Sequence, residues 1–421
     1  MINDANYEKN PKLGFYKVGS QVFYSKPLAY VEATKQGIDP SWHFNSATYA
    51  RLNWEQEPEV DIRELYRTRA QQLREKYDWI RLECSGGGDS ATAAFAFLLN
   101  GIHLDEIVFR YPKHGEKGAT NDPFNTKATN TLSEWQFAAQ PLLDWVKTKF
   151  PKTVVRIHDY SETMLDEEKT KDESWVFNTQ HWFQPGHASK YTHFGLKEHR
   201  DLANSGKSIC VLLGIDKPKV TIINDSWYAF FLDIQATSAN PITNGYTNIT
   251  TEYFYWTPDF TEIVVKQSHM IRRWFDMPQN QHLHHLVRWP NTDVNARTAY
   301  EFLAKSIVYP DYDLATWQTD KPTNSFYNEM DQWFYKNFQD TELYRTWEAG
   351  LDFLVNKIDP KYFLTMLGKP SGLRANTSPL YYIGPVAGKL PAETVPNWTT
   401  TTTETRQVIV IKDKKMKIID A

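Results

Sequence analysis

WIRLECSGGGDSATAAFAFLLN, residues 79–100, joins an apolar run to a glycine-rich turn and then to a helical pattern. Residues 79–84 have the length and apolar content of a β-strand, and three consecutive glycines then predict a turn with backbone angles that other residues rarely adopt. Asp89 and Ser90 open a helix that continues with almost no polar face, which predicts its burial. Unpaired amides and the positive end of the helix dipole point into such a turn, so the stretch predicts an anion site.

Three glycines alone fit equally well a tight turn that binds nothing. The complete string Ser85-Gly86-Gly87-Gly88-Asp89-Ser90, between a predicted strand and a predicted helix, resembles the SGGxDS signature of the PP-loop ATP pyrophosphatases. This superfamily includes asparagine synthetase, GMP synthetase, tRNA lysidine synthetase and phosphoadenylylsulfate reductase. In it, the loop holds the pyrophosphate end of ATP and the enzyme cleaves between the α and β phosphates. The resemblance covers residues 77–220 and implies ATP and Mg²⁺ as cofactors.

The resemblance also implies roles for the loop residues. The groups suited to phosphate oxygens are the amides of Gly86, Gly87 and Gly88 and the hydroxyls of Ser85 and Ser90. Asp89 is suited to a catalytic role in which it holds a magnesium ion that bridges the phosphates. The alternative interpretation of Asp89 is a simple helix cap.

A second candidate loop follows the predicted strand over residues 208–213. Parallel strands end at the same edge of a sheet, so Gly214-Ile215-Asp216-Lys217 is expected beside the first loop and is a further candidate for nucleotide binding. Asp216 is a candidate for assisting magnesium, and Lys217 and Lys219 are candidates for neutralising the leaving pyrophosphate. The string departs from the acidic glycine motif of asparagine synthetases, and a polar turn without a ligand is the alternative.

Four segments are expected along the chain. Strands and helices alternate through residues 61–235, which predicts an α/β fold with a doubly wound parallel sheet covered on both faces. Residues 1–60 predict a small N-terminal α+β module with a hairpin around Gly19. Residues 236–398 predict a mainly helical, aromatic-rich domain, and residues 399–421 predict a C-terminal hairpin.

Composition excludes several classes of protein. A formal charge of −4 gives no global basic field, so tight nonspecific binding to DNA is disfavoured. Cys84 and Cys210 are the only cysteines and stand in apolar runs, which predicts buried reduced thiols and excludes a disulfide scaffold. No apolar run approaches the roughly 18 residues of a membrane span, and the N-terminus lacks the pattern of a signal peptide. We therefore expect a cytoplasmic protein, and similar standalone chains are typical of tailed phages.

Seven of the twelve histidines form two groups, at residues 181–199 and 282–285. Zinc sites use tighter spacings and usually include thiolates or carboxylates, so a metal role is disfavoured. Substrate contacts from the first group are the second interpretation, and a solvated surface is the favoured one.

Cysteines that are missing from the sequence discriminate among the reactions of the superfamily. The C-terminal segment lacks the cysteine that phosphoadenylylsulfate reductases need, and no pair of reactive cysteines fits a thiolating enzyme. Ile2 follows Met1, where enzymes with a built-in glutaminase carry cysteine. The expected reaction is therefore adenylation of a carboxylate or amide oxygen, followed by displacement of AMP by an amine or ammonia. The expected partners are ATP and an unidentified small-molecule or nucleobase acceptor.

Two alternatives from other classes remain. One is a PP-loop enzyme that modifies a nucleic-acid base, with contacts from the aromatic residues 175–199 and the basic residues 412–417. The other is a non-catalytic nucleotide-binding protein whose aromatic region binds a protein partner.

Overall fold

A five-stranded parallel sheet organises the part of the chain that the structure, a computed structural model, describes. That part comprises residues 8–111, 113, 134–159, 183, 197–233, 246–290, 294–312, 336–366, 369–387, 407–412 and 415–420. The strands are β4 (Trp79–Glu83), β5 (Glu106–Tyr111), β6 (Val154–Asp159), β7 (Ile209–Leu213) and β10 (Ile249–Tyr253). Their order is β10-β7-β4-β5-β6, and every neighbouring pair is parallel.

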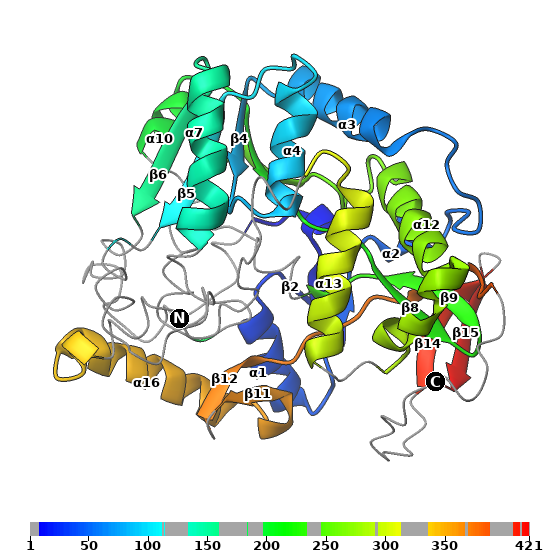
Figure 1. Ribbon diagram of the computed structural model, residues 1–421. Helices are drawn as coiled ribbons and strands as arrows, with labels where there is room; N and C mark the ends of the chain where they lie inside the picture. Colours follow the sequence, from blue (N-terminus) through cyan, green and yellow to red (C-terminus); the bar gives the residue numbers. More distant parts are fainter. Residues whose placement is uncertain are drawn as a thin grey trace.

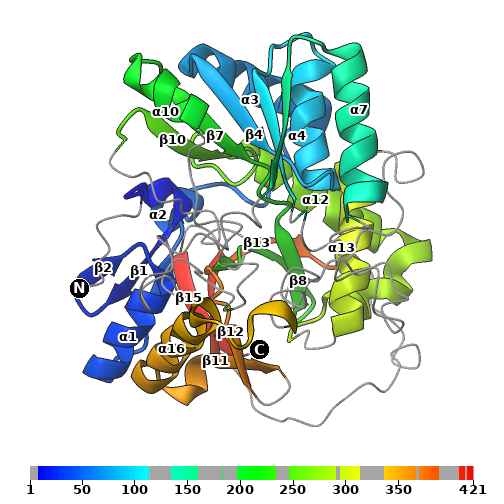
Figure 2. The ribbon, with the colours of Figure 1, turned by 90° about the vertical axis from the view of Figure 1, so that its left-hand side faces the viewer.

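Helices cover both faces of this sheet (Figure 2). One face carries α3 (Ile62–Lys76), α4 (Gly88–Leu98) and α7 (Gln140–Lys149), and the other carries α10 (Lys197–Asn204). Successive side chains of a strand point to opposite faces, so alternate residues of one strand serve different cores. In β7, Cys210 and Leu212 join the large core, whereas Ile209 and Val211 pack with Ala203 of α10. The architecture is α/β, as predicted, and is compatible with a doubly wound fold.

The order of the strands reverses beside β4. The chain passes from β4 to β5 and β6 on one side and then returns to place β7 on the other side of β4. In open α/β sheets, ligands bind outside the carboxyl ends of the strands at such a reversal. The carboxyl ends of β4 and β7 therefore define the region in which a site is expected.

A second five-stranded sheet has the order β15-β14-β13-β9-β8. Its strands are β8 (Lys219–Ile223), β9 (Ser226–Phe230), β13 (Leu380–Pro385), β14 (Gln407–Lys412) and β15 (Lys415–Asp420). The two residues between β8 and β9, Asn224 and Asp225, have φ of 47° and 56°. Both values match the type I′ turn that closes two-residue hairpins, in a conformation that Asn and Asp tolerate. The antiparallel pair of β14 and β15 is the C-terminal hairpin that the sequence predicts.

The region that the sequence predicts as mainly helical also contributes strands. Its helices are α12 (Glu262–Asp276), η7 (Pro278–Val287), α13 (Val294–Val308), α16 (Glu342–Lys357) and η8 (Pro360–Tyr362). Its strands are β10, β13, β11 (Phe363–Met366) and β12 (Lys369–Leu373), of which β10 completes the parallel sheet. The helix expected over 161–173, most of the aromatic stretch 175–199 and most of the helix expected over 325–338 lie outside the described residues.

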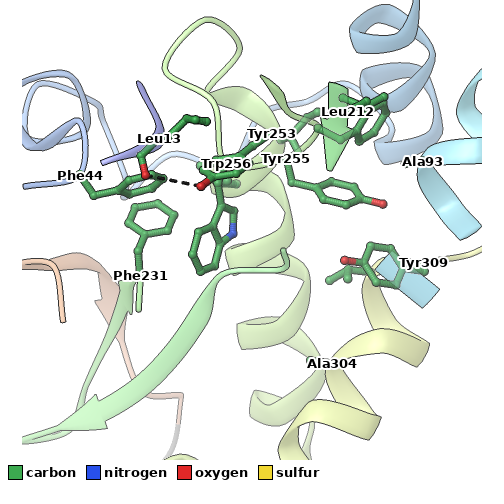
Figure 3. Packing of buried hydrophobic residues seen from close by; sticks show 14 of the residues in the cluster. Leu13, Phe44, Ala93, Leu212, Phe231, Tyr253, Tyr255, Trp256, Ala304 and Tyr309 are labelled. Atoms are coloured by element: carbon green, nitrogen blue, oxygen red, sulfur yellow. Dashed lines mark hydrogen bonds between the residues drawn. The ribbon is translucent and has the colours of Figure 1, made fainter. Parts of the chain in front are cut away.

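The N-terminal residues form a small α+β unit. Its elements are η2 (Pro11–Leu13), β1 (Phe15–Val18), β2 (Gln21–Phe23), α1 (Lys26–Gln36), β3 (Ser41–His43) and α2 (Ser46–Tyr49). β1 and β2 form the predicted hairpin, and Gly19 in its turn has φ of 58°. Phe44 joins this unit to the rest, because its ring centroid lies 5.1 Å from that of Phe231, which in turn lies 4.9 Å from Trp256 (Figure 3).

Within the described ranges, no helix is both long enough and apolar enough to cross a lipid bilayer.

Candidate active site

The glycine loop connects the end of β4 to the start of α4, and its shape depends on Gly86. This residue has φ of 77°, a left-handed conformation that favours glycine. A Cβ atom at Gly86 would also lie 2.5 Å from the backbone C of Ala138 and N of Ala139, in the π-helix η4 (Glu134–Ala139). The loop therefore lies directly against the backbone of η4.

The hydroxyl of Ser90 holds the loop in shape. Its Oγ donates to the carbonyl of Gly87 at 3.2 Å and accepts from the amide of Ser85 at 3.2 Å. The carbonyl of Gly87 also accepts the amide of Ala91, so Gly87 is the N-cap of α4. The first amides of a helix have no carbonyl partner within it, and these amides are the groups of the loop that suit an anion.

The second predicted loop touches the first one, backbone to backbone. Gly214 follows β7, and a Cβ atom on it would lie 2.8 Å from the carbonyl oxygen of Asp89 and 2.8 Å from Cα of Ser90. Only glycine fits such an approach without a shift of the backbone. The carboxyl ends of β4 and β7 therefore meet at the reversal of strand order.

Five charged residues meet where the two loops touch, and we refer to them as the charge cluster: Asp89, Asp216, Lys217, Lys219 and Glu301. Nζ of Lys217 lies 2.6 Å from Oε2 of Glu301, 3.0 Å from Oδ1 of Asp216 and 3.4 Å from Oδ1 of Asp89. Nζ of Lys219 lies 3.1 Å from Oδ2 of Asp216 and also pairs with Glu301. Four of the five are residues that the sequence singles out, and the fifth, Glu301, comes from α13.

Mutual pairing keeps this cluster charged despite its burial. Burial disfavours the ionised form of Asp89, but Lys217 and then Lys305 outweigh it and hold the pKa of Asp89 well below its ordinary value. Burial likewise opposes the ionisation of Glu301, yet Lys217 and Lys219 lower its pKa to about 2. For Lys217, burial would lower the pKa, and the carboxylates around it raise the pKa well above the ordinary value.

Tyrosine hydroxyls fix Asp89 and the loop. Tyr309 donates to Oδ1 of Asp89 at 2.6 Å, Tyr255 donates to the carbonyl of Asp89 at 2.7 Å, and Tyr312 donates to the carbonyl of Gly86 at 3.3 Å. The rings of Tyr255 and Tyr309 lie next to each other with centroids 5.5 Å apart (Figure 3). The second half of the chain therefore encloses the loop that the first half forms.

No motif in the sequence singles out Glu301 or the tyrosines. A faint signal is present, because Glu301, Lys305 and Tyr309 recur at intervals of four residues and so share one face of a helix. Nothing in that spacing says which loop the face meets, since the contact is made by tertiary packing alone.

One arginine and two histidines lie outside the charge cluster. Arg110 pairs with Glu83, with Nε 2.9 Å from Oε2, at the carboxyl ends of β5 and β4. The expectation of a solvated surface is wrong for His199 and His284, which are 2% and 0% exposed. Nδ1 of His199 lies 2.8 Å from a guanidinium nitrogen of Arg81, and Nε2 of His199 lies 2.5 Å from a carboxylate oxygen of Glu106, so buried charged groups hold this ring.

Magnesium could be held here only with help from a ligand. Among the described residues, no group of three or more His, Cys, Asp or Glu side chains is arranged to hold a metal ion. Lysines contact both carboxylate oxygens of Asp216 and of Glu301, and Lys217 contacts Oδ1 of Asp89. Asp89 is the carboxylate of the cluster that belongs to the glycine loop, and so the one best placed beside a bound phosphate. Mg²⁺ usually binds one or two carboxylates together with phosphate oxygens and water, and the residues present fit that mode.

Comparison of the chain with known protein families found no matching family model, and comparison with curated proteins found no matching sequence.

Proposed function

We propose that the protein is an ATP-dependent adenylating enzyme, which cleaves ATP to AMP and pyrophosphate and thereby activates a carboxylate or amide oxygen of an acceptor. The observation that carries this proposal is the meeting of Asp89, at the N-terminus of α4, with Lys217 and Lys219 beside the reversal of strand order. A helix N-terminus with two lysines beside it favours a polyanion such as the phosphates of a nucleotide.

The residues of the site have separate roles in this reaction. The acceptor oxygen attacks the α phosphorus, the bond from that phosphorus to the bridging oxygen breaks, and pyrophosphate leaves with the electron pair. The loop amides after Gly86 bind phosphate oxygens, and the ammonium groups of Lys217 and Lys219 neutralise the charge that develops on the leaving group. An amine or ammonia then displaces AMP from the activated carbon.

Asp89 is suited to hold Mg²⁺ beside the phosphates, where the ion supplies additional positive charge. The carboxylate remains ionised because its pKa lies well below the ordinary value. The hydroxyl of Tyr309, at 2.6 Å, orients it by donating to one of its oxygens.

The test is the release of AMP and pyrophosphate from ATP and Mg²⁺ in the presence of a panel of carboxylate and amide acceptors. We expect Lys217→Met and Asp89→Asn each to lower the rate by about 100-fold or more, as loss of a group that stabilises the transition state does. The matched control is Lys35→Met, since the Lys35 side chain is 75% exposed in α1 and should leave the rate unchanged. Release of ADP and phosphate, or no turnover with any acceptor, would overturn the proposal.

The two alternative functions predict other results when the same purified protein is assayed. Modification of a nucleic-acid base requires salt-dependent binding of RNA or DNA. A non-catalytic role requires ATP binding without turnover. The residues 175–199 on which the nucleic-acid alternative rests lie mostly outside the described part of the chain, and no contact among the described residues favours either function.

A further inference from the structure

The carboxylate of Glu301 lies between the two lysines that the proposed function assigns to pyrophosphate. One of its oxygens pairs with Lys217 at 2.6 Å, and the other pairs with Lys219. The side chains of Lys217 and Lys219 are only 2% and 6% exposed. Each ammonium group is thus enclosed by carboxylates, and a phosphate reaches both lysines only where Glu301 withdraws.

The other acidic partner of the lysines is fixed in place. Asp216 precedes Lys217 in the chain, and its Oδ1 accepts the amide of Lys217 at 2.7 Å as well as the ammonium group. The side chain of Asp216 is 10% exposed, whereas that of Glu301 is 27% exposed and belongs to a separate element. Glu301 is therefore the exchangeable anion of the cluster.

Helix α13 carries Glu301 and is docked on both loops by tyrosine hydroxyls. Tyr300, next to Glu301, donates to the carbonyl of Pro218 at 2.9 Å and accepts the amide of Val220 at 3.2 Å. Tyr300 lies in the middle of α13, and just beyond its C-terminal end Tyr309 donates to Asp89. In Figure 1, α13 lies below α4. Tyr66 of α3 also donates to the carbonyl of Val308 at 2.8 Å, so contacts at Pro218, at Asp89 and at α3 together hold the helix that carries Glu301.

We propose that Glu301 is an intramolecular competitor of the pyrophosphate group, and that α13 closes the anion site until a nucleotide displaces it. This inference rests on the proposed function for the identity of the anion. A carboxylate with one oxygen on each lysine makes the charge-assisted contacts that two phosphate oxygens would make. The free energy that docks α13 in the closed state must then be subtracted from the affinity for the nucleotide.

The test is the binding of inorganic pyrophosphate to the full chain, measured by calorimetry without ATP. Glu301→Gln removes the competing charge and preserves the size of the side chain, and we expect it to bind pyrophosphate at least about 10-fold more tightly than the wild type, by removal of the closing contact. Glu301→Asp keeps the charge but shortens the side chain by one methylene, and should lie between the two. Glu342→Gln, in a side chain that is 80% exposed on α16, is the matched control and should bind as the wild type does.

A second readout follows α13 itself. Saturating pyrophosphate should speed amide hydrogen exchange in residues 300–308 of the wild type and leave α10 unchanged, because α10 lies on the other face of the parallel sheet. Circular dichroism and thermal unfolding establish that each variant is folded. If Glu301→Gln does not fold, Glu301→Asp is used for the binding measurement. Equal or weaker pyrophosphate binding by the folded variants, or no binding by any of the proteins at millimolar pyrophosphate, overturns the inference.

These outcomes separate the inference from the proposed function. Tighter binding by Glu301→Gln without any release of AMP from ATP supports the competing role of Glu301 and removes the adenylating enzyme. Release of AMP together with unchanged pyrophosphate binding does the opposite.

Discussion

Replacement of Gly86 by alanine measures how closely the glycine loop lies against η4. The substitution has two costs. Alanine at φ of 77° adopts a left-handed conformation, which costs about 1–2 kcal/mol. Its Cβ would also lie 2.5 Å from backbone atoms of Ala138 and Ala139, so either the loop or η4 must shift, and overpacking of this kind costs about 1–3 kcal/mol. We expect a total loss of about 2–5 kcal/mol in the free energy of unfolding.

Gly101 supplies a matched control for the backbone term. It follows α4, has φ of 70°, and a Cβ atom on it would have no heavy atom within 4 Å. Gly101→Ala therefore carries the left-handed strain without the contact, and should cost about 1–2 kcal/mol. The difference between the two variants isolates the approach of the loop to η4.

Urea unfolding followed by circular dichroism gives the two free energies of unfolding. The slope of each transition checks that both variants expose the same surface area when they unfold. We expect the free energy of unfolding of Gly86→Ala to be at least about 1 kcal/mol lower than that of Gly101→Ala. Equal losses in the two variants would refute the contact between Gly86 and η4. In that case the glycine would be required by backbone conformation alone.

Two further predictions concern side chains. Glu106 is fully buried and accepts from Arg156 at 2.7 Å and from His199, so Glu106→Gln should lower the free energy of unfolding at pH 7 by about 3 kcal/mol in a urea titration, and a loss below about 1 kcal/mol would contradict the buried pairing. Burial opposes ionisation of Glu106, but His199 and then Arg156 lower its pKa to about 2, below the ordinary 4.5. The stabilisation is therefore present above pH 4.5 and is lost as the pH falls toward 2. The difference in the free energy of unfolding between wild type and Glu106→Gln should shrink over that interval. Tyr309→Phe removes the hydroxyl that donates to Asp89, and should lower the free energy of unfolding by about 1–2 kcal/mol with an unchanged circular dichroism spectrum; an unfolding curve identical to that of the wild type would show that this bond is not made.

The parallel sheet and the two loops were largely predictable from sequence. β4, β5 and β7 are apolar runs bounded by glycine or polar turns, and a parallel sheet buried on both faces produces such runs. The carboxyl ends of parallel strands share one edge, so the loops at Gly86 and Gly214 were expected to be neighbours before any contact was known. Local pattern and a general rule of topology were sufficient for that part of the site.

β10 was not predicted, because its polar residues outnumber its apolar ones and one of them is a carboxylate inside the core. Its sequence ITTEY contains Glu252, which is 3% exposed and looks like a surface residue in the sequence. In the fold, Arg69 and Lys76 of α3 reach it at 3.1 Å and 2.6 Å. A buried carboxylate is stable only with such partners, and partners that lie more than 170 residues away along the chain leave no trace in local periodicity. The same reason explains why Glu301 could not be assigned to the site.

The formal charges of the cluster determine what α13 does there. Asp89, Asp216 and Glu301 face Lys217 and Lys219, and Lys305 adds its charge near Asp89, so three negative groups meet three positive ones before any phosphate arrives. Two like charges 4 Å apart repel by about 4 kcal/mol at the effective dielectric near a protein surface, so pyrophosphate and Glu301 cannot share the lysines. If Glu301 withdraws, two carboxylates remain against three lysines, and this excess of positive charge favours the phosphates, as would Mg²⁺ held by Asp89. The affinity of the site for nucleotide would then depend on how firmly α13 is docked as well as on the lysines themselves.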